Sequence, residues 1–309
     1  MLESNNALEK MGAVIVAYHP DTKKLLRLIE LLIPSVRYLY VMDNGGAAWL
    51  EGAIKEQNWT SVFRVDMDGN QGISKALNRS FELLAEKSVS WIATFDQDSC
   101  PPTGMLQSLR AELNRPENNN QLKVAAIGPT IVDVRGNVVV RHPFIVFSKY
   151  SAKKTTSSDR NETFKVDHLI TSGCLISVEA WRKVKFDENL FIDLVDIDWC
   201  WRVINSGYCL LGTGRVEMPH EISETGISKR FGRAVNEYNP IRRYYFVRNS
   251  VYLIMKKRLK IVQVAYLCRG VASAIFSALL SDADKKSSLS AIFRGVSDGL
   301  AGQMGSVSG

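Results

Sequence analysis

The sequence predicts an α/β fold of three layers, in which helices cover both faces of a mostly parallel sheet. Short apolar, β-branched segments alternate with segments whose apolar residues recur at helical spacing, which is typical of parallel strands joined by crossover helices. Polar residues follow the ends of the predicted strands, where open parallel sheets bind ligands. At 309 residues and 46% hydrophobic composition, the chain is long enough for one large domain with a smaller appended element.

The first predicted strand, residues 12–18, is apolar on both faces. Asp21 precedes leucines and isoleucines at helical spacing, so we expect it to cap a helix that Pro34 closes. Residues 73–84 read as a further helix, which a Gly-Asn-Gln-Gly turn introduces. Three further strands are predicted at residues 38–42, 62–65 and 90–95.

Four predicted strands are each followed by a polar residue, namely His19, Asp43, Asn70 and Asp96. Because parallel strands end at the same edge of a sheet, we expect these side chains to gather at one rim. The rim is therefore the predicted ligand-binding edge.

The second half of the chain has a looser pattern. Residues 137–147 read as a strand and the polar residues 148–165 as a mobile loop. A basic run at 256–260 then precedes an apolar helix over residues 261–280, which Arg269 interrupts. Because a central arginine costs roughly 2.5–3.5 kcal/mol in a spanning helix, we expect this helix to lie on a surface. That surface is either a membrane or the protein's own domain.

The net charge of +7 and the pI near 9.1 favour an anionic partner, such as a nucleoside diphosphate, nucleic acid or anionic lipid. No nucleic-acid-binding motif accompanies the charge, so nucleic acid is not an expected partner. Five scattered cysteines without a CxxC pair favour a reducing compartment. The N-terminus lacks a secretory pattern, which makes the cytoplasm the expected location.

Asp96 and Asp98 directly follow a predicted strand. Residues two apart in extended backbone point the same way, so both carboxylates face one site. Nearby carboxylates repel unless a cation lies between them. Mg²⁺ and Mn²⁺ prefer such oxygen ligands and share coordination with substrate phosphates. The alternative interpretation is that Asp98 caps a helix beginning near Pro101.

A second acidic cluster, Asp193, Asp196 and Asp198, lies among bulky apolar residues, where buried carboxylates are costly without a partner or a purpose. One interpretation makes a carboxylate of this cluster a general base with a pKa adjusted by desolvation. The other has Asp198 cap a helix or pair with Arg202. Small residues at 171–174 would let a ligand approach the backbone closely, and the glycines at 69–72 would place amides near a phosphate.

Six segments match, in order, the motifs of a known family: residues 14–20, 41–45, 70–78, 95–99, 172–174 and 193–202. The chain resembles the family 2 inverting glycosyltransferases of the GT-A fold, and within them the bacterial rhamnosyltransferases of polysaccharide or O-antigen assembly. The resemblance spans about residues 12–220. It implies a Rossmann-like GT-A domain over residues 1–235, with a donor half at about 12–133 and an acceptor half at about 134–235. A C-terminal helical extension over 236–309 follows.

The resemblance also implies roles for single residues. The nucleobase would be held by Tyr18, Pro20 and Asp43, the ribose and diphosphate by Asn70 and Asn78, and the rest of the donor by Asp96, Gln97, Gly173 and His220. Asp98 would be the principal metal ligand, with Asp96 nearby and His220 as a further ligand. The family's Glu-Asp pair is Val195-Asp196 here, so Asp196 takes the base role with Asp193 as the fallback. Arg242, Arg248 and Asn249 would lie on the acceptor side.

The activity implied is transfer of L-rhamnose from dTDP-L-rhamnose, with Mg²⁺ or Mn²⁺, to a saccharide or lipid-linked oligosaccharide. The enzyme would lie on the cytoplasmic face of the inner membrane. Two other hypotheses are a catalytically silent nucleotide-sugar-binding or scaffolding protein and a sugar-phosphate nucleotidyltransferase. The latter normally carries a glycine-rich basic signature near its first strand, which residues 14–24 do not supply.

Overall fold

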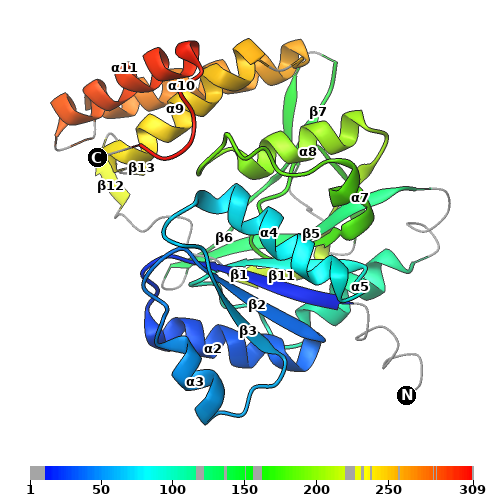
Figure 1. The fold of residues 1–309 in the computed structure, drawn as a ribbon. Helices are drawn as coiled ribbons and strands as arrows, with labels where there is room; N and C mark the ends of the chain where they lie inside the picture. The colour runs from blue at the N-terminus through cyan, green and yellow to red at the C-terminus, as the bar shows by residue number, and fades with distance from the viewer. Residues whose placement is uncertain are drawn as a thin grey trace.

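A computed structural model describes residues 11–115, 122–135, 138–149, 151–155, 162–219, 227–230, 233–236, 239–256, 258–280, 282 and 284–307. Its centre is a nine-stranded sheet in the order β3-β2-β1-β4-β10-β5-β11-β9, with β6 added to β5 (Figure 1). The strands are β1 Met11–Ala17, β2 Tyr38–Asp43, β3 Val62–Asp66, β4 Trp91–Asp96, β5 Val124–Arg135, β6 Val138–Arg141, β9 Thr163–Val166, β10 Cys174–Ser177 and β11 Cys209–Pro219. The first four are mutually parallel, as predicted.

Helices cover both faces of the sheet, which confirms the three-layer α/β prediction. One face packs against α2 Thr22–Leu32, α3 Leu50–Glu56 and α5 Met105–Leu113. The other face packs against α4 Gly72–Glu86, α7 Val178–Lys183 and α8 Val195–Asn205. Along β1, Ala13 and Ile15 enter the first core and Val14 enters the second, because successive strand side chains point to opposite faces.

Local signals set the first helices as expected. Asp21 caps α2 by accepting a hydrogen bond from the Lys24 N–H at 2.9 Å. The helix ends in a short 3₁₀ turn, η1 Ile33–Ser35, at Pro34. The helix predicted over residues 73–84 is α4.

The segment after β5 differs from the predictions. Residues 137–147 form two strands rather than one: β6 pairs with β5, and β7 Phe144–Phe147 pairs with β8 Ala152–Thr155 in a separate sheet. Pro143, which lacks an N–H for a strand ladder, lies between them. The predicted loop 148–165 contains β8 and β9. β8 pairs with the neighbouring strand β7, whereas β9 pairs with β11, which is distant in sequence; the polar composition of the loop concealed both strands.

The C-terminal helices α9 Pro240–Lys256, α10 Ile261–Leu280 and α11 Lys285–Ala301 form a layer beyond α8 (Figure 1). Glycines let α11 approach α9 closely: a Cβ at Gly299 would come within 2.7 Å of the Arg248 carbonyl oxygen. A buried ion pair of 2.5 Å joins Arg243 of α9 to Asp282, which precedes α11. A hairpin of β12 Ile227–Arg230 and β13 Arg233–Asn236 precedes this layer in the chain.

Candidate active site

The strand ends meet at one edge of the sheet, as the parallel pairing requires. Register places Asp43 beside Ala17 and Asp66, and Asp96 beside Val16. The sequence therefore located the rim correctly, although the rim's polar residues have different tasks.

Tyr18 is presented at this rim by Gln97. The Gln97 amide accepts a hydrogen bond from the Tyr18 N–H at 2.7 Å and donates one to the Tyr18 carbonyl at 3.1 Å. The Tyr18 ring is 49% exposed and packs edge-on against His19, while Pro20 is partly exposed beside it. Tyr18 and Pro20 are accessible at the rim, and their contact with a nucleobase stays a prediction. The Gln97 amide was expected to contact the donor, but in the structure both of its hydrogen bonds go to the Tyr18 backbone.

Protein contacts hold Asp43, for which a role in binding the nucleobase was predicted. Its carboxylate is 2% exposed and accepts hydrogen bonds from the Gly45 and Ala47 N–H groups at 2.8 and 3.1 Å. Arg64 pairs with the second oxygen at 2.7 Å and with Asp66 at 2.7 Å. These partners fix the Asp43 carboxylate at the rim, and its contact with a nucleobase stays a prediction.

Asn78 lies in the core rather than at the rim. Its amide donates to the Phe186 carbonyl at 3.0 Å and to Glu188 at 2.8 Å, and it accepts from the Trp181 ring N–H at 3.0 Å. At 3% exposure it fixes α4 to the chain before α8, which contradicts the predicted contact with ribose or diphosphate.

Three backbone N–H groups at the start of α4 are hydrogen-bonded within the protein. Asn70 accepts from the Gly72 N–H at 3.1 Å, and the Phe191 carbonyl accepts from the Ile73 N–H at 2.7 Å. The Gln71 N–H reaches the Asn44 side chain at 3.3 Å. The Gln71 and Gly72 amides are therefore occupied within the protein, whereas a phosphate contact by the rest of the turn stays a prediction, and Asn70 is partly exposed.

Asp98 is not a helix cap. The helix after it begins at Met105, with Gly104 in the cap position at φ +79°. The Asp98 side chain is exposed and has no hydrogen bond or ion pair within the described ranges. Asp96 ends β4, and its N–H points to the Ser172 hydroxyl at 3.4 Å, which in turn contacts the Ser99 hydroxyl at 2.7 Å. This anchoring leaves the Asp98 carboxylate directed to solvent, where a ligand can reach it.

The carboxylates at the end of β4 suit a metal ion that a bound nucleotide would also coordinate. Among the residues that the structure describes, no group of three or more His, Cys, Asp or Glu side chains could hold a metal ion. The predicted third ligand, His220, lies outside the described residues. Asp98 with Asp96 nearby suits Mg²⁺ or Mn²⁺, which take few protein carboxylates and complete their coordination with phosphates and water.

Asp196 lies in the first turn of α8, after a sharp bend. Asp193 and Leu194 both have left-handed backbone, at φ 63° and 61°, and the Asn249 amide holds the bend by donating to the Ile192 and Asp193 carbonyls. The Asp196 carboxylate accepts from the Ile197 N–H at 2.8 Å. Burial, and then the negative charges of Asp193 and Asp96, raise the pKa of Asp196 to about 6. Asp96 and Asp196, a hundred residues apart in sequence, therefore lie near enough for their charges to interact.

A curated relative identifies the family to which this site belongs. The sequence is 31% identical over 252 residues to the dTDP-rhamnosyl transferase RfbF of Shigella flexneri, covering 81% of each chain. The chain belongs to this family of rhamnosyltransferase-like glycosyltransferases. No protein-family model matches the sequence.

Solved structures give the glycosyltransferase its fold. The chain superposes on GalNAc-T7, solved with UDP, GalNAc and Mn²⁺, with a TM-score of 0.61 and 12% identity. The match covers 94% of this chain but 56% of that one, so the chain spans about half the length of GalNAc-T7. It also superposes on residues 1–349 of S. aureus TarS, with a TM-score of 0.57, 12% identity and coverage of 93% and 81%. The fold is GT-A.

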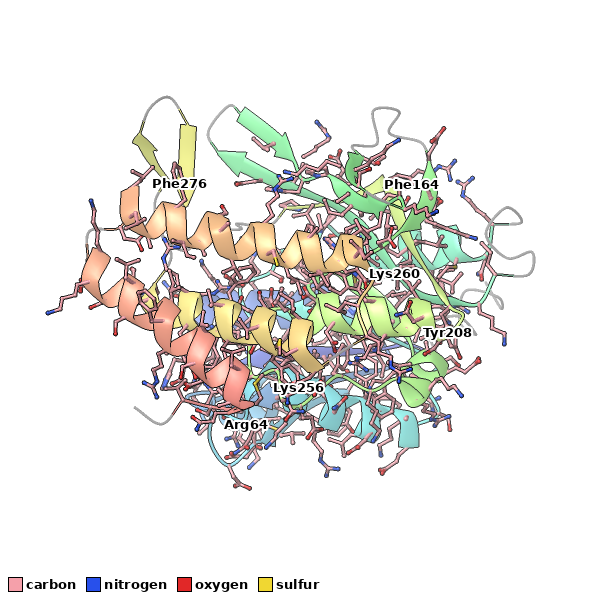
Figure 2. All side chains as sticks on the ribbon, turned by 90° about the horizontal axis from the view of Figure 1, so that it is seen from above. Arg64, Phe164, Tyr208, Lys256, Lys260 and Phe276 are labelled. Carbon is pink, nitrogen blue, oxygen red and sulfur yellow. The ribbon has the colours of Figure 1, made fainter. Side chains whose placement is uncertain are left out.

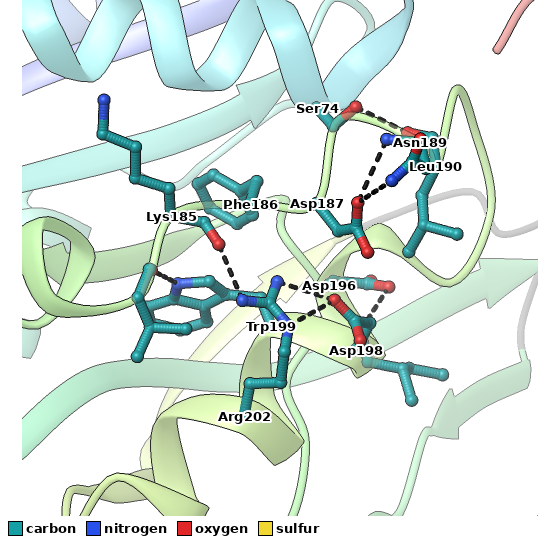
Figure 3. A network of polar contacts seen from close by, with 12 residues as sticks. Ser74, Lys185, Phe186, Asp187, Asn189, Leu190, Asp196, Asp198, Trp199 and Arg202 are labelled. Carbon is teal, nitrogen blue, oxygen red and sulfur yellow. Dashed lines mark hydrogen bonds and ion pairs between the residues drawn. The ribbon is translucent and has the colours of Figure 1, made fainter. Parts of the chain in front are cut away.

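The other acidic residues of the glycosyltransferase are ion-paired. Asp198 is buried and pairs with Arg202 at 2.6 Å, while Arg202 also donates to the Lys185 carbonyl (Figure 3). This ion pair is the structural alternative that the sequence suggested for Asp198. Asp193, the fallback base, pairs with Arg242 at 2.9 Å. Asp196 is thus the better base candidate, because no cation pairs with it among the described residues.

Three further residues have mainly packing roles. A Cβ on Gly173, where φ is +80°, would come within 2.3 Å of the Met218 sulfur, and its N–H donates to the Thr94 carbonyl. Packing thus explains the glycine, and a donor contact remains a prediction. Arg248 is buried and donates to the Gly305 carbonyl, so with Asn249 it holds the C-terminal helices against the site. Neither side chain is the predicted acceptor contact.

Two residues near the site, Asp66 and Tyr266, were not predicted from the sequence. Asp66 ends β3 at the rim and is exposed, so the rule applied to the other strand ends would have found it. Ser172, within the small residues at 171–174, anchors the Asp96 loop. Tyr266 of α10 lies close enough to Asp196 for that charge to raise the pKa of its phenol, after burial. No local pattern marks Tyr266, because its approach depends on how α10 packs.

Proposed function

We propose that this glycosyltransferase moves L-rhamnose from dTDP-L-rhamnose to a saccharide hydroxyl in a single displacement that inverts the anomeric carbon. The observation that carries the proposal is the placement of Asp196, a half-buried carboxyl without a paired cation among the described residues, near Asp96 and its loop. The printed activity of the Shigella relative supports the choice of donor.

In this reaction the acceptor oxygen bonds to the anomeric carbon as the bond from that carbon to the diphosphate breaks. The electron pair leaves with dTDP, and Asp196 accepts the hydroxyl proton. A base with a pKa near 6 is largely ionised at neutral pH and still accepts a proton well. Asp98, assisted by Asp96, would hold Mg²⁺ or Mn²⁺, which neutralises charge on the departing diphosphate.

Thermal unfolding with nucleotides tests the donor and metal assignments. We expect dTDP with Mg²⁺ or Mn²⁺ to raise Tm more than UDP or GDP does, because a ligand at a hundred times its Kd adds about 2.7 kcal/mol. The Asp98→Asn variant should lose the metal-dependent part of the shift. Asp68→Asn, which changes a carboxylate on the turn after β3, is the matched control. Absence of any shift with dTDP would remove the rim as the donor site. A shift without turnover of dTDP-L-rhamnose would favour the silent binding protein.

We further propose that the acceptor is lipid-linked, for cell-surface polysaccharide synthesis, and that α10 rests on the cytoplasmic face of the membrane. Within the described ranges, α10 is the one helix that is long and apolar enough to cross a membrane by length and composition. Its outward side chains are 37% to 81% exposed, and they include Ile261, Ile275, Phe276, Leu279 and Leu280. Arg269 lies in the same helix, which favours a surface position over a crossing.

Charge and position support this placement of α10. The exposed Lys260 lies at the end of α10 opposite Phe276 (Figure 2), and the exposed Arg258 precedes it by two residues in the chain. Each contributes about 1 kcal/mol at an anionic surface. On its inner side, the Tyr266 ring lies 5.7 Å from His168 and 6.3 Å from Trp201, measured between ring centroids. A membrane beneath α10 would therefore be close to the acceptor side of the site.

Vesicle co-sedimentation tests the membrane contact. We expect the protein to bind phosphatidylglycerol-containing vesicles at low salt and to be released at high salt, since screening weakens the cationic attraction. Phe276→Glu should reduce the bound fraction at least by half. Val140→Glu, which changes an exposed apolar side chain on β6, should leave it unchanged. Equal binding by wild type and Phe276→Glu would exclude α10 as the contact.

A further inference from the structure

A cavity of about 160 Å³ lies beside the loop that anchors Asp96. Its walls come from the middle of β5, the turn between β6 and β7, and the chain before β10. They include Pro129, His142, Phe144, His168, Leu169 and Ser172. Most of the lining is apolar, with a few polar groups.

The cavity lies between the two halves of the catalytic machinery. One wall is Ser172, whose hydroxyl contacts Ser99 and the Asp96 N–H. Another wall is Leu169, whose N–H points to the Cys200 sulfur at 3.5 Å, one helical turn beyond Asp196. The charge of Asp196 contributes, after burial, to the raised pKa of both Cys200 and the cavity residue Cys174. A ligand in the cavity therefore lies near the proposed base.

His168 is a polar group of this cavity with a ring nitrogen that protein contacts leave unpaired within the described residues. Its Nδ1 is buried and has no hydrogen-bond partner within the described part of the chain. Phe147 and Tyr266 lie 6.5 and 5.7 Å away between ring centroids, and neither provides an acceptor or donor to it. Burial lowers the pKa of His168 to about 4, so its imidazole is neutral at physiological pH. A buried polar atom without a partner costs free energy that a bound ligand would recover.

We propose that this cavity binds one sugar ring of the acceptor, with His168 hydrogen-bonded to a ring hydroxyl and Phe144 against the apolar face of the ring. This assignment rests on the proposed glycosyl transfer. Pockets for whole drug-sized ligands occupy roughly 300–1,000 Å³, so a cavity of this size suits a single ring. The neutral imidazole suits a hydroxyl better than a phosphate, so the nucleotide remains at the rim. The site sets acceptor specificity.

Saturation-transfer NMR on the dTDP-loaded protein tests the assignment. The probes are methyl glycosides of L-rhamnose, D-glucose, D-galactose and N-acetyl-D-glucosamine. We expect at least one glycoside to receive saturation. His168→Phe should weaken that binding roughly three- to tenfold, as for loss of one neutral hydrogen bond. His168→Asn, whose amide can occupy the Nδ1 position, should recover part of the affinity.

Trp201→Phe is the matched control. It removes another buried ring N–H without a partner from the same aromatic cluster, but Trp201 does not line the cavity, so glycoside binding should not change. The dTDP-induced rise in Tm is followed in every variant. If it persists while no glycoside binds wild type, the acceptor subsite is wrong and the donor assignment stands. If dTDP itself fails to bind, the proposed function fails. A His168→Phe variant that weakens dTDP-L-rhamnose instead of glycosides would overturn the proposal.

Discussion

Replacing Asp196 with asparagine should lower the rate of dTDP release from dTDP-L-rhamnose by about 10²–10⁴-fold, the usual effect of removing a general base. The asparagine oxygen can still accept the Ile197 N–H hydrogen bond, so the bend before α8 should persist. Initial rates with water or a methyl glycoside as the acceptor measure the loss. Asp193→Asn is the control. Asp193 is ion-paired with Arg242, so this substitution should reduce the rate far less. The reverse ranking of the two variants would transfer the base role to Asp193.

The pH dependence of this prediction follows from the pKa of about 6. The carboxylate is the active form, so the wild-type rate should fall about tenfold per unit below pH 6 and level off above it, while the residual Asp196→Asn rate lacks this step. The native pKa is above the unfolded value of 3.8, so folding favours the protonated form. Ionisation therefore destabilises the native state as pH rises through about 4 to 6. Asp196→Asn should be roughly 1–3 kcal/mol more stable than wild type at pH 8, with no gain below about pH 3.

Replacing Arg243 with leucine should lower the free energy of unfolding by about 3–5 kcal/mol. Arg243 is 2% exposed and pairs with Asp282 at 2.5 Å, and it also donates to the Ala274 carbonyl and the Ser277 hydroxyl. These bonds join α9 to α10 and to the start of α11. The variant leaves Asp282 buried and charged without its cation. Urea unfolding measures the loss.

Two comparisons distinguish this loss from a general effect of removing an arginine. Arg294→Leu removes a side chain that is 58% exposed and 3.5 Å from Asp298, so it should cost no more than about 1 kcal/mol. The double variant Arg243→Leu with Asp282→Leu should recover much of the stability, because no unpaired charge remains buried. Unchanged stability of Arg243→Leu would show that the pair does not hold the helical layer.

The sequence alone determined the order of elements in the donor half and the location of its rim. Hydrophobic period, the Asp21 cap and the Pro34 stop are local signals, so β1, α2, β2 and α4 follow from them. Asp96 and Asp98 were predictable because a polar residue that ends a parallel strand must lie at the ligand-binding edge. The resemblance to a known family then singled out Asp196 within its acidic cluster.

The tertiary structure alone decided which hydrogen-bonding partners the polar residues have. Asp43, Asn78 and Gln97 are the residue types that a donor site needs, and each has a protein partner distant in sequence. Strand β10 enters antiparallel between β4 and β5, and no local pattern specifies that pairing. His168 and Tyr266 acquire their positions only when α10 packs against the acceptor half. Residue type and hydrophobic periodicity indicate which local secondary structure a segment prefers. The burial of a side chain and the partners of its hydrogen bonds depend on contacts across the whole chain.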